Sequence, residues 1–182
     1  MTLLDFARGP GLEWSLYIFV FGIIWRLVGS MMIMAKKDLS KPRKRSSIKD
    51  GIATIGRRSL PTPAFEHRIR FQHISGYLWH LALFISVLFF APHILFFDDL
   101  VGLNWFHLPN NLVFVVSVIT LISLIAALVM RVSNPAQRII STFDDYFSWL
   151  VTFLPVLTGL LATMHLGARY ETLLAIHILS VC

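Results

Sequence analysis

The stretch LVFVVSVITLISLIAALVMRV, from Leu112 to Val132, decides the class of fold. Its charge is confined to Arg131, next to its end. A helix needs about 20 consecutive apolar residues to cross the hydrocarbon core of a bilayer. This stretch has that length, and it therefore predicts a membrane-spanning helix.

Similar apolar stretches occur on both sides of it. We expect transmembrane helices at about 12–35, 74–97, 112–132 and 146–164, and a fifth at 172–182. The fifth rises only about 16 Å at about 1.5 Å per residue, roughly half of the hydrocarbon thickness. We therefore expect the fifth helix to be truncated in this sequence. The prediction is an all-α integral membrane bundle of five transmembrane helices, forming a single domain over 1–182.

Composition and charge support a membrane protein and exclude other classes. The 182 residues are 56% apolar and 14% charged, whereas soluble domains carry about 25% charged residues. Most of the 16 Lys and Arg residues lie in the loop 36–71, while the loop 98–111 has two Asp and no Lys or Arg. The positive-inside rule then places the loop 36–71 in the cytoplasm and the N-terminus outside. The concentration of the cations in one loop between membrane spans argues against a nucleic-acid partner.

Three of the seven histidines are flanked on both sides by apolar residues, namely His80, His93 and His177. An ionisable side chain inside a bilayer is costly, so such residues are functional candidates by default. Imidazoles on facing helices can ligate haem iron without thiolates. The single cysteine, Cys182, excludes an iron–sulfur cluster held by thiolates of this chain.

Depth along the helices pairs two of these histidines. His93 lies about 7.5 Å of helical rise before Asp98, the outer end of its span, and His177 lies about 9 Å after Glu171. The match predicts one haem held between His93 and His177 near the outer leaflet. His80 lies about 20 Å further inward, where its partner on the fifth helix would come after the last residue.

Other polar groups of the membrane region have two readings each. Arg26 either extends its head to the interface or pairs with a haem propionate. His165 and His107 are either interfacial polar residues or contacts of a quinone. The basic loop is an orientation signal that also docks a partner or anionic lipid.

The order of these elements resembles the cytochrome b, or gamma, subunit of respiratory nitrate reductase and its relatives in transmembrane redox complexes of sulfate-reducing bacteria. The resemblance covers the entire chain and includes the segment RYETLLAIHILSVC, from Arg169 to Cys182, which is similar to the family's entry into its fifth helix. It implies that His93 and His177 ligate an outer haem b and that His80 ligates an inner one. His73 is the substitute ligand if the pairing is shifted.

The resemblance also implies a setting. The chain would lie in the bacterial inner (cytoplasmic) membrane, use a quinone or quinol as substrate and assemble with iron–sulfur or multihaem cytochrome subunits. The family's basic residue near the quinol has no counterpart in the loop 98–111, so that contact does not carry over.

The predicted function is therefore a haem b-containing subunit of a respiratory oxidoreductase complex. It would transfer electrons between the quinone pool and a partner redox subunit, without a stand-alone catalytic site. One alternative is a haem-free membrane anchor or assembly subunit whose histidines serve packing. Another is a small transporter or channel with a histidine proton relay, which predicts internal pseudo-symmetry; the sequence shows no repeat of that kind.

Overall fold

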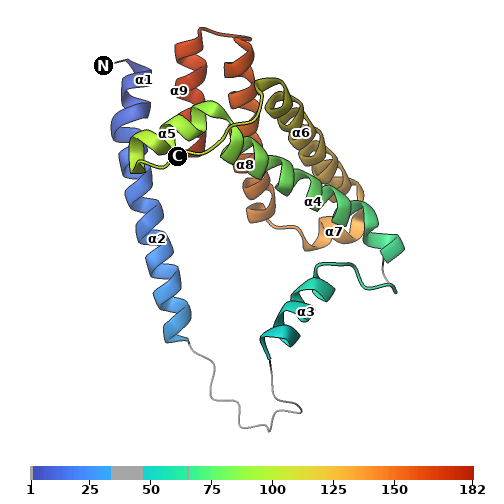
Figure 1. Cartoon of the computed structure of the whole chain (residues 1–182). Coiled ribbons are helices and arrows are strands. Elements are labelled where there is room, and N and C mark those ends of the chain that lie inside the picture. The colour runs from blue at the N-terminus through green and yellow to red at the C-terminus, as the bar shows by residue number, and fades with distance from the viewer. Residues whose placement is uncertain (1, 34–46, 65) are drawn as a thin grey trace. The chain divides into compact units, whose positions relative to one another are not determined.

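The computed structural model describes residues 2–33, 47–64 and 66–182, and all regular structure in these ranges is helical (Figure 1). The predicted all-α membrane fold is confirmed, and the chain is a multi-pass membrane protein. Four helices are long and apolar enough to cross a membrane, and they span Leu3–Met32, Glu66–Phe89, Asn110–Ser133 and Phe143–Met164. The apolar helix Tyr170–Val181 is shorter.

The chain forms two compact units, one over residues 1–13 and 72–182 and the other over 14–71. The first unit contains α1 (Leu3–Phe6), the π-helix η1 (Ala7–Gly11), most of α4 (Glu66–Phe89), α5 (Ala91–Val101), α6 (Asn110–Ser133), α7 (Pro135–Ile140), α8 (Phe143–Met164) and α9 (Tyr170–Val181). The second contains nearly all of α2 (Leu12–Met32), α3 (Ile48–Arg58) and the first residues of α4.

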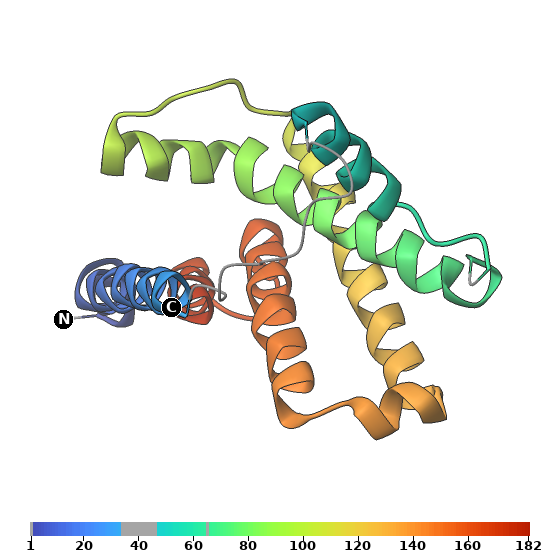
Figure 2. The same cartoon turned by 90° about the horizontal axis from the view of Figure 1, so that it is seen from below.

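In the first unit, α8 and α9 pack side by side in opposite directions (Figures 1 and 2). Helix α6 packs against α8, while α1 and η1 pack against α9. The approach of η1 is close, because a Cβ added at Gly11 would lie 3.3 Å from Cδ2 of Leu179. The first and last helical segments of the chain therefore lie against each other.

Small polar side chains join α4 to α6. Oγ of Ser86 lies 3.1 Å from Oγ of Ser117, and Ser75 donates to the carbonyl of Ser123 at 3.4 Å. Between membrane helices there is little hydrophobic driving force, so association depends on close packing and on interhelical hydrogen bonds. These hydroxyl groups are therefore contacts between the helices.

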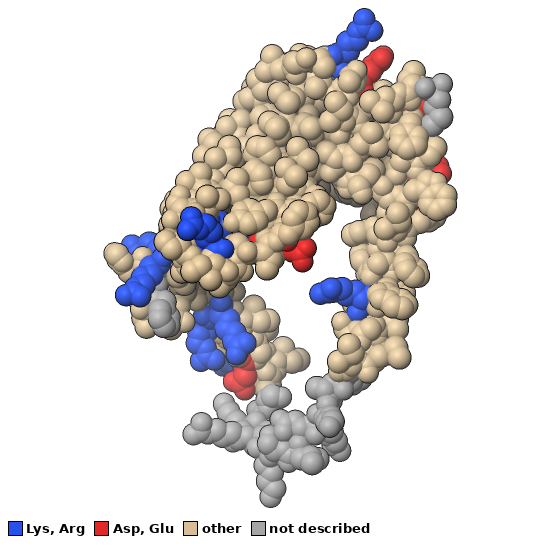
Figure 3. Space-filling model, turned by 180° about the vertical axis from the view of Figure 1, so that it is seen from behind, with Lys and Arg blue, Asp and Glu red and all other residues tan. Residues whose placement is uncertain are grey.

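Much of the surface is apolar. Large side chains such as Phe84 and Ile122 are 62% and 61% exposed, and the space-filling view shows charged residues only in small groups on a mostly uncharged face (Figure 3). A soluble monomer rarely exposes apolar area on this scale. Lipid is the solvent that suits such a surface.

The span expected at about 74–97 is divided into two helices in the structure. Helix α4 ends at Phe89, Phe90 is extended (φ −85°, ψ 126°), and α5 starts again at Ala91 with Pro92 in its first turn. Proline lacks the N–H that a continuing helix would need, but it fits the first turn of a new one.

The loop 36–71 also differs from a plain loop, since it contains α3 and the start of α4. Its residues 36–46 and 65 lie outside the described part.

Candidate functional site

The structure brings His93 and His177 together. His93 lies in the first turn of α5 and His177 in α9, with their ring centroids 6.1 Å apart and their planes 17° from parallel. Both side chains are partly buried. The proximity that their equal depth predicts is observed, and their role as iron ligands stays a prediction.

The end of α4 orients His93. Its Nδ1 lies 3.1 Å from the carbonyl oxygen of Ser86 and 3.2 Å from that of Val87. The last four carbonyls of a helix have no partner within that helix. His93 therefore donates from Nδ1 to carbonyls that the helix break has left free.

The other two carbonyls at this helix end are also satisfied. The indole N–H of Trp105 donates to Leu88 at 2.6 Å, and the backbone N–H of Leu108 donates to Phe89 at 2.9 Å. An unpaired carbonyl inside a bilayer would cost several kcal/mol. The break beside His93 is thus stabilised by the loop that follows α5, which supplies hydrogen-bond donors to the free carbonyls.

Helix α8 orients His177. The Nδ1 atom lies 3.0 Å from the carbonyl oxygen of Pro155 and 3.3 Å from Oγ1 of Thr158. Thr158 Oγ1 in turn lies 3.1 Å from Oγ of Ser180, which donates to the backbone carbonyl of His177 at 2.7 Å. The imidazole is thereby fixed from both α8 and its own helix.

A glycine on α8 makes room for this ring. A Cβ added at Gly159 would lie 2.9 Å from Cε1, 3.1 Å from Nδ1 and 3.5 Å from Nε2 of His177. Real Cβ atoms essentially never approach another heavy atom closer than 3.0 Å. The ring therefore rests directly on the backbone of α8, and only glycine allows this position.

The donor set of the pair suits a metal. A carbonyl oxygen can only accept, so each Nδ1 carries the proton and each Nε2 keeps its lone pair. Ligating histidines usually have this arrangement, with the second ring nitrogen donating to a carbonyl. The ring centroids lie 6.1 Å apart, so the two imidazoles are neighbours.

The site consists of two ligand candidates. In the described part of the chain, no group of three or more His, Cys, Asp or Glu could hold a metal ion. Two histidines would be sufficient to hold the iron of a haem, so His93 and His177 would be the residues that hold it.

The remaining predicted histidine ligands lie elsewhere on α4. His80 is exposed, stacks on Trp79 with centroids 3.5 Å apart, and its Nδ1 lies 2.6 Å from the carbonyl oxygen of Gly76. His73 packs edge-on against Tyr77 at 5.0 Å. The roles of His80 as inner-haem ligand and of His73 as substitute ligand stay predictions.

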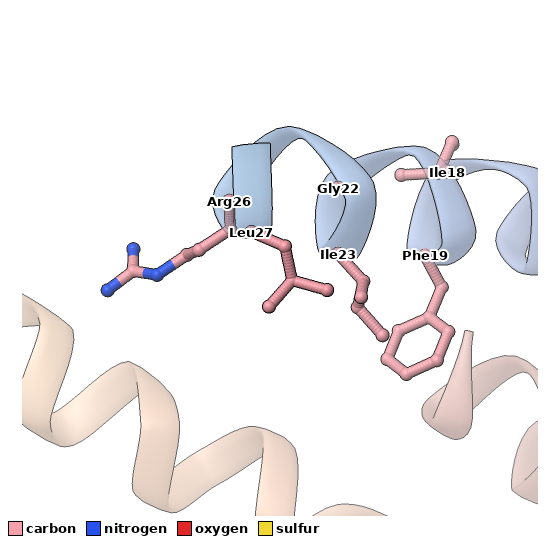
Figure 4. Close-up of a pocket in the computed structure, with 6 residues that line it drawn as sticks. All are labelled: Ile18, Phe19, Gly22, Ile23, Arg26 and Leu27. Atoms are coloured by element: carbon pink, nitrogen blue, oxygen red, sulfur yellow. The ribbon is translucent and has the colours of Figure 1, made fainter. Parts of the chain in front are cut away.

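Arg26 belongs to the second unit. It borders a shallow, open hollow along one side of α2, and its guanidinium extends away from the helix (Figure 4). The residues of this hollow are Ile18, Phe19, Gly22, Ile23, Arg26 and Leu27. The pairing of Arg26 with a haem propionate stays a prediction.

The two candidate quinone contacts are exposed. His165 ends α8 in the left-handed conformation (φ 55°) with its ring 5.0 Å from that of Tyr170. The ring of His107 has its Nδ1 3.3 Å from the carbonyl oxygen of Leu108. Both positions agree with interfacial polar residues, and quinone contact stays a prediction.

Three contributors to the site were not identified from the sequence, namely Ser86, Thr158 and Gly159. A glycine within an apolar span is a signal of close helix approach, and this signal could have indicated Gly159.

Comparison with known proteins gives little beyond this geometry. No family model matches the chain, and no solved structure matches it. The chain is 25% identical over 179 residues to a protein of Nitratidesulfovibrio vulgaris (strain Hildenborough) that is named only "Protein". The match covers 96% of this chain and 79% of that protein. The similarity extends over nearly the whole chain, so it includes the membrane-spanning helices of this chain and is not limited to a local motif.

Proposed function

We propose that the chain is a haem b-containing membrane subunit of a respiratory oxidoreductase complex, transferring electrons between the quinone pool and a partner redox subunit. The observation that carries the proposal is the pair of nearly parallel imidazoles of His93 and His177, 6.1 Å apart. A merely structural histidine needs one hydrogen-bond partner. Here two histidines from separate helices lie side by side, each with its Nδ1 at a carbonyl.

The chain's own residues prepare the ligands. The carbonyls at the end of α4 hold the Nδ1 proton of His93, and the carbonyl of Pro155 holds that of His177. This fixes the tautomer and the direction of each Nε2, which lowers the entropy lost on ligation. The bound haem would supply one-electron transfer, which no side chain here provides. Partial burial of both rings among membrane helices keeps the surroundings poor in water.

The wider setting follows from the same proposal. His80 would hold a second haem b toward the basic side of the membrane, and the partner subunits would carry iron–sulfur clusters or several haems. The concentration of most of the Lys and Arg residues in the loop 36–71 supports the bacterial inner membrane with the N-terminus outside. Electron exchange with quinone would use the outer end of the bundle, near His165.

The test is the reduced-minus-oxidised spectrum of the purified full chain expressed with ample haem. We expect a b-type α-band that is lost or strongly reduced in both His93→Ala and His177→Ala. The matched control is His107→Ala, in an exposed loop, which should leave the band unchanged. A second haem at His80 predicts partial loss in His80→Ala.

Two results would contradict the proposal. Absence of any α-band in the wild-type chain would favour the haem-free anchor. An α-band that persists at full intensity in both His93→Ala and His177→Ala would place the haem elsewhere.

A further inference from the structure

Helix α3 (Ile48–Arg58) is encoded locally, inside the basic loop. Oγ of Ser47 accepts from the backbone N–H of Asp50 at 3.2 Å and so caps the N-terminus. Arg57 and Arg58 lie in the last turn, where positive charge interacts favourably with the helix dipole. These local interactions favour a helix in this segment.

The helix has one apolar face. Ile48, Ile52 and Ile55 have the i, i+4, i+7 spacing that places side chains on one side of a helix, and they are 85%, 65% and 69% exposed. The same spacing places Lys49 and Arg58 at the two borders of this face and Arg57 opposite it. At 11 residues its length is about 16 Å, so it is too short to cross a bilayer.

The connections of α3 keep it near the membrane. The helix lies between the membrane-spanning helices α2 and α4, so it stays on the side of the bilayer where α2 ends and α4 begins. The residues 59–65 between α3 and Glu66, the start of α4, can reach at most about 25–30 Å when fully extended. A lipid surface is therefore always within reach of the isoleucine face.

The positive charge of α3 indicates that the lipid it binds is anionic. The helix carries Lys49, Arg57 and Arg58 against Asp50, a net charge of +2. Each cation near an anionic surface shifts the bound-to-free ratio by about fivefold. An amphipathic helix with basic residues beside an apolar face lies in the interface plane of anionic membranes.

We propose that α3 is an interfacial helix that binds anionic lipid headgroups through the flanking residues Lys49 and Arg58, with Arg57 adding positive charge and the three isoleucines lying in the acyl boundary. It holds residues 48–58 on the bilayer surface. This proposal does not depend on haem, so its outcome and that of the proposed function are separate.

The test measures label depth on the full chain in vesicles. A nitroxide is attached in a Cys182→Ser background at Ile52→Cys, on the apolar face, or at Thr54→Cys, on the polar face, as the matched control. Accessibility to oxygen and to a water-soluble nickel complex is compared in vesicles with and without phosphatidylglycerol in phosphatidylcholine.

We expect the label at 52 to be lipid-buried and the label at 54 to remain in water when phosphatidylglycerol is present. Replacing Lys49, Arg57 and Arg58 by Gln should lower the buried-to-aqueous ratio at 52 by at least tenfold in these vesicles. Salt of about 1 M should do the same, because it shortens the screening length to about 3 Å.

Three results would overturn the proposal. Equal water accessibility at 52 and 54 in anionic vesicles would show that the face is not in lipid. If the label at 52 is equally buried in pure phosphatidylcholine and in the Gln variant, anionic lipid has no role in the binding of α3. Spin–spin coupling between labels of two molecules would assign the face to a second copy of the chain.

Discussion

Replacing Gly159 by alanine tests whether the position of His177 is set by the backbone of α8. The added Cβ would lie 2.9 Å from Cε1 of His177, while ordinary contact begins at 3.4 Å. The ring must therefore retreat by about 0.5 Å, in a region packed too tightly to absorb the change freely. The bond from Nδ1 to the Pro155 carbonyl, now 3.0 Å, would be strained or lost.

The size of the effect follows from the cost of overpacking. One extra methyl group in a well-packed interior costs about 1–3 kcal/mol. If this cost falls on the ligated geometry, the affinity for haem should drop by about 5- to 150-fold, since 1.4 kcal/mol corresponds to tenfold. Any share that falls on the fold appears as a lower unfolding temperature.

The assay is haem titration of the purified apo-chain in detergent, followed by the α-band, with thermal unfolding measured in parallel. Gly22→Ala is the matched control, because Gly22 also lies in a membrane helix and an added Cβ there meets nothing within 4 Å. We expect the control to bind haem as the wild type does. If Gly159→Ala binds haem with unchanged affinity and unfolds at an unchanged temperature, the close contact with His177 does not determine the site.

Three smaller changes test other contacts. Thr158→Val removes one of two acceptors near Nδ1 of His177, which should raise the haem midpoint potential by about 20–60 mV in a redox titration; a lowered potential would contradict this. Trp105→Phe removes the donor to the carbonyl of Leu88 and leaves that carbonyl unpaired, which should destabilise the chain by about 1–3 kcal/mol in thermal unfolding, whereas no change would mean that another donor replaces the indole. Arg131→Gln breaks a partly exposed ion pair between α6 and α8, so we expect less than about 1 kcal/mol, and a loss above about 3 kcal/mol would show that the pair is effectively buried.

The membrane-spanning helices could be predicted because lipid restricts the choice of structure. Without water to satisfy backbone groups, an apolar stretch such as Leu112–Val132 can cross only as a helix. The proximity of His93 and His177 could be predicted for a related reason, because the position of a residue along a membrane-spanning helix gives its depth in the bilayer. Depth alone was sufficient to pair them, although His93 lies in a separate helix that the sequence did not predict.

The rest depends on contacts between distant segments. Pro92 is compatible with a kinked helix as well as with a broken one, and what decides is the supply of donors for the freed carbonyls. Those donors include Trp105 and Leu108, which lie after α5. Gly159 acquires its role only when the facing surfaces of α8 and α9 are known. By contrast, α3 could have been predicted from the capping residue Ser47 and from the spacing of its isoleucines. It was not predicted, because the many charges of the loop suggested an irregular segment.

The packing of α1 and η1 against α9 has a consequence for biosynthesis. Helix α9 is synthesised long after α1 and η1, so these N-terminal turns must wait in the bilayer until α9 has been made. His93 waits equally long for the imidazole of His177 beside it. Under the proposed function, haem would therefore enter between the two histidines only after α9 has been synthesised.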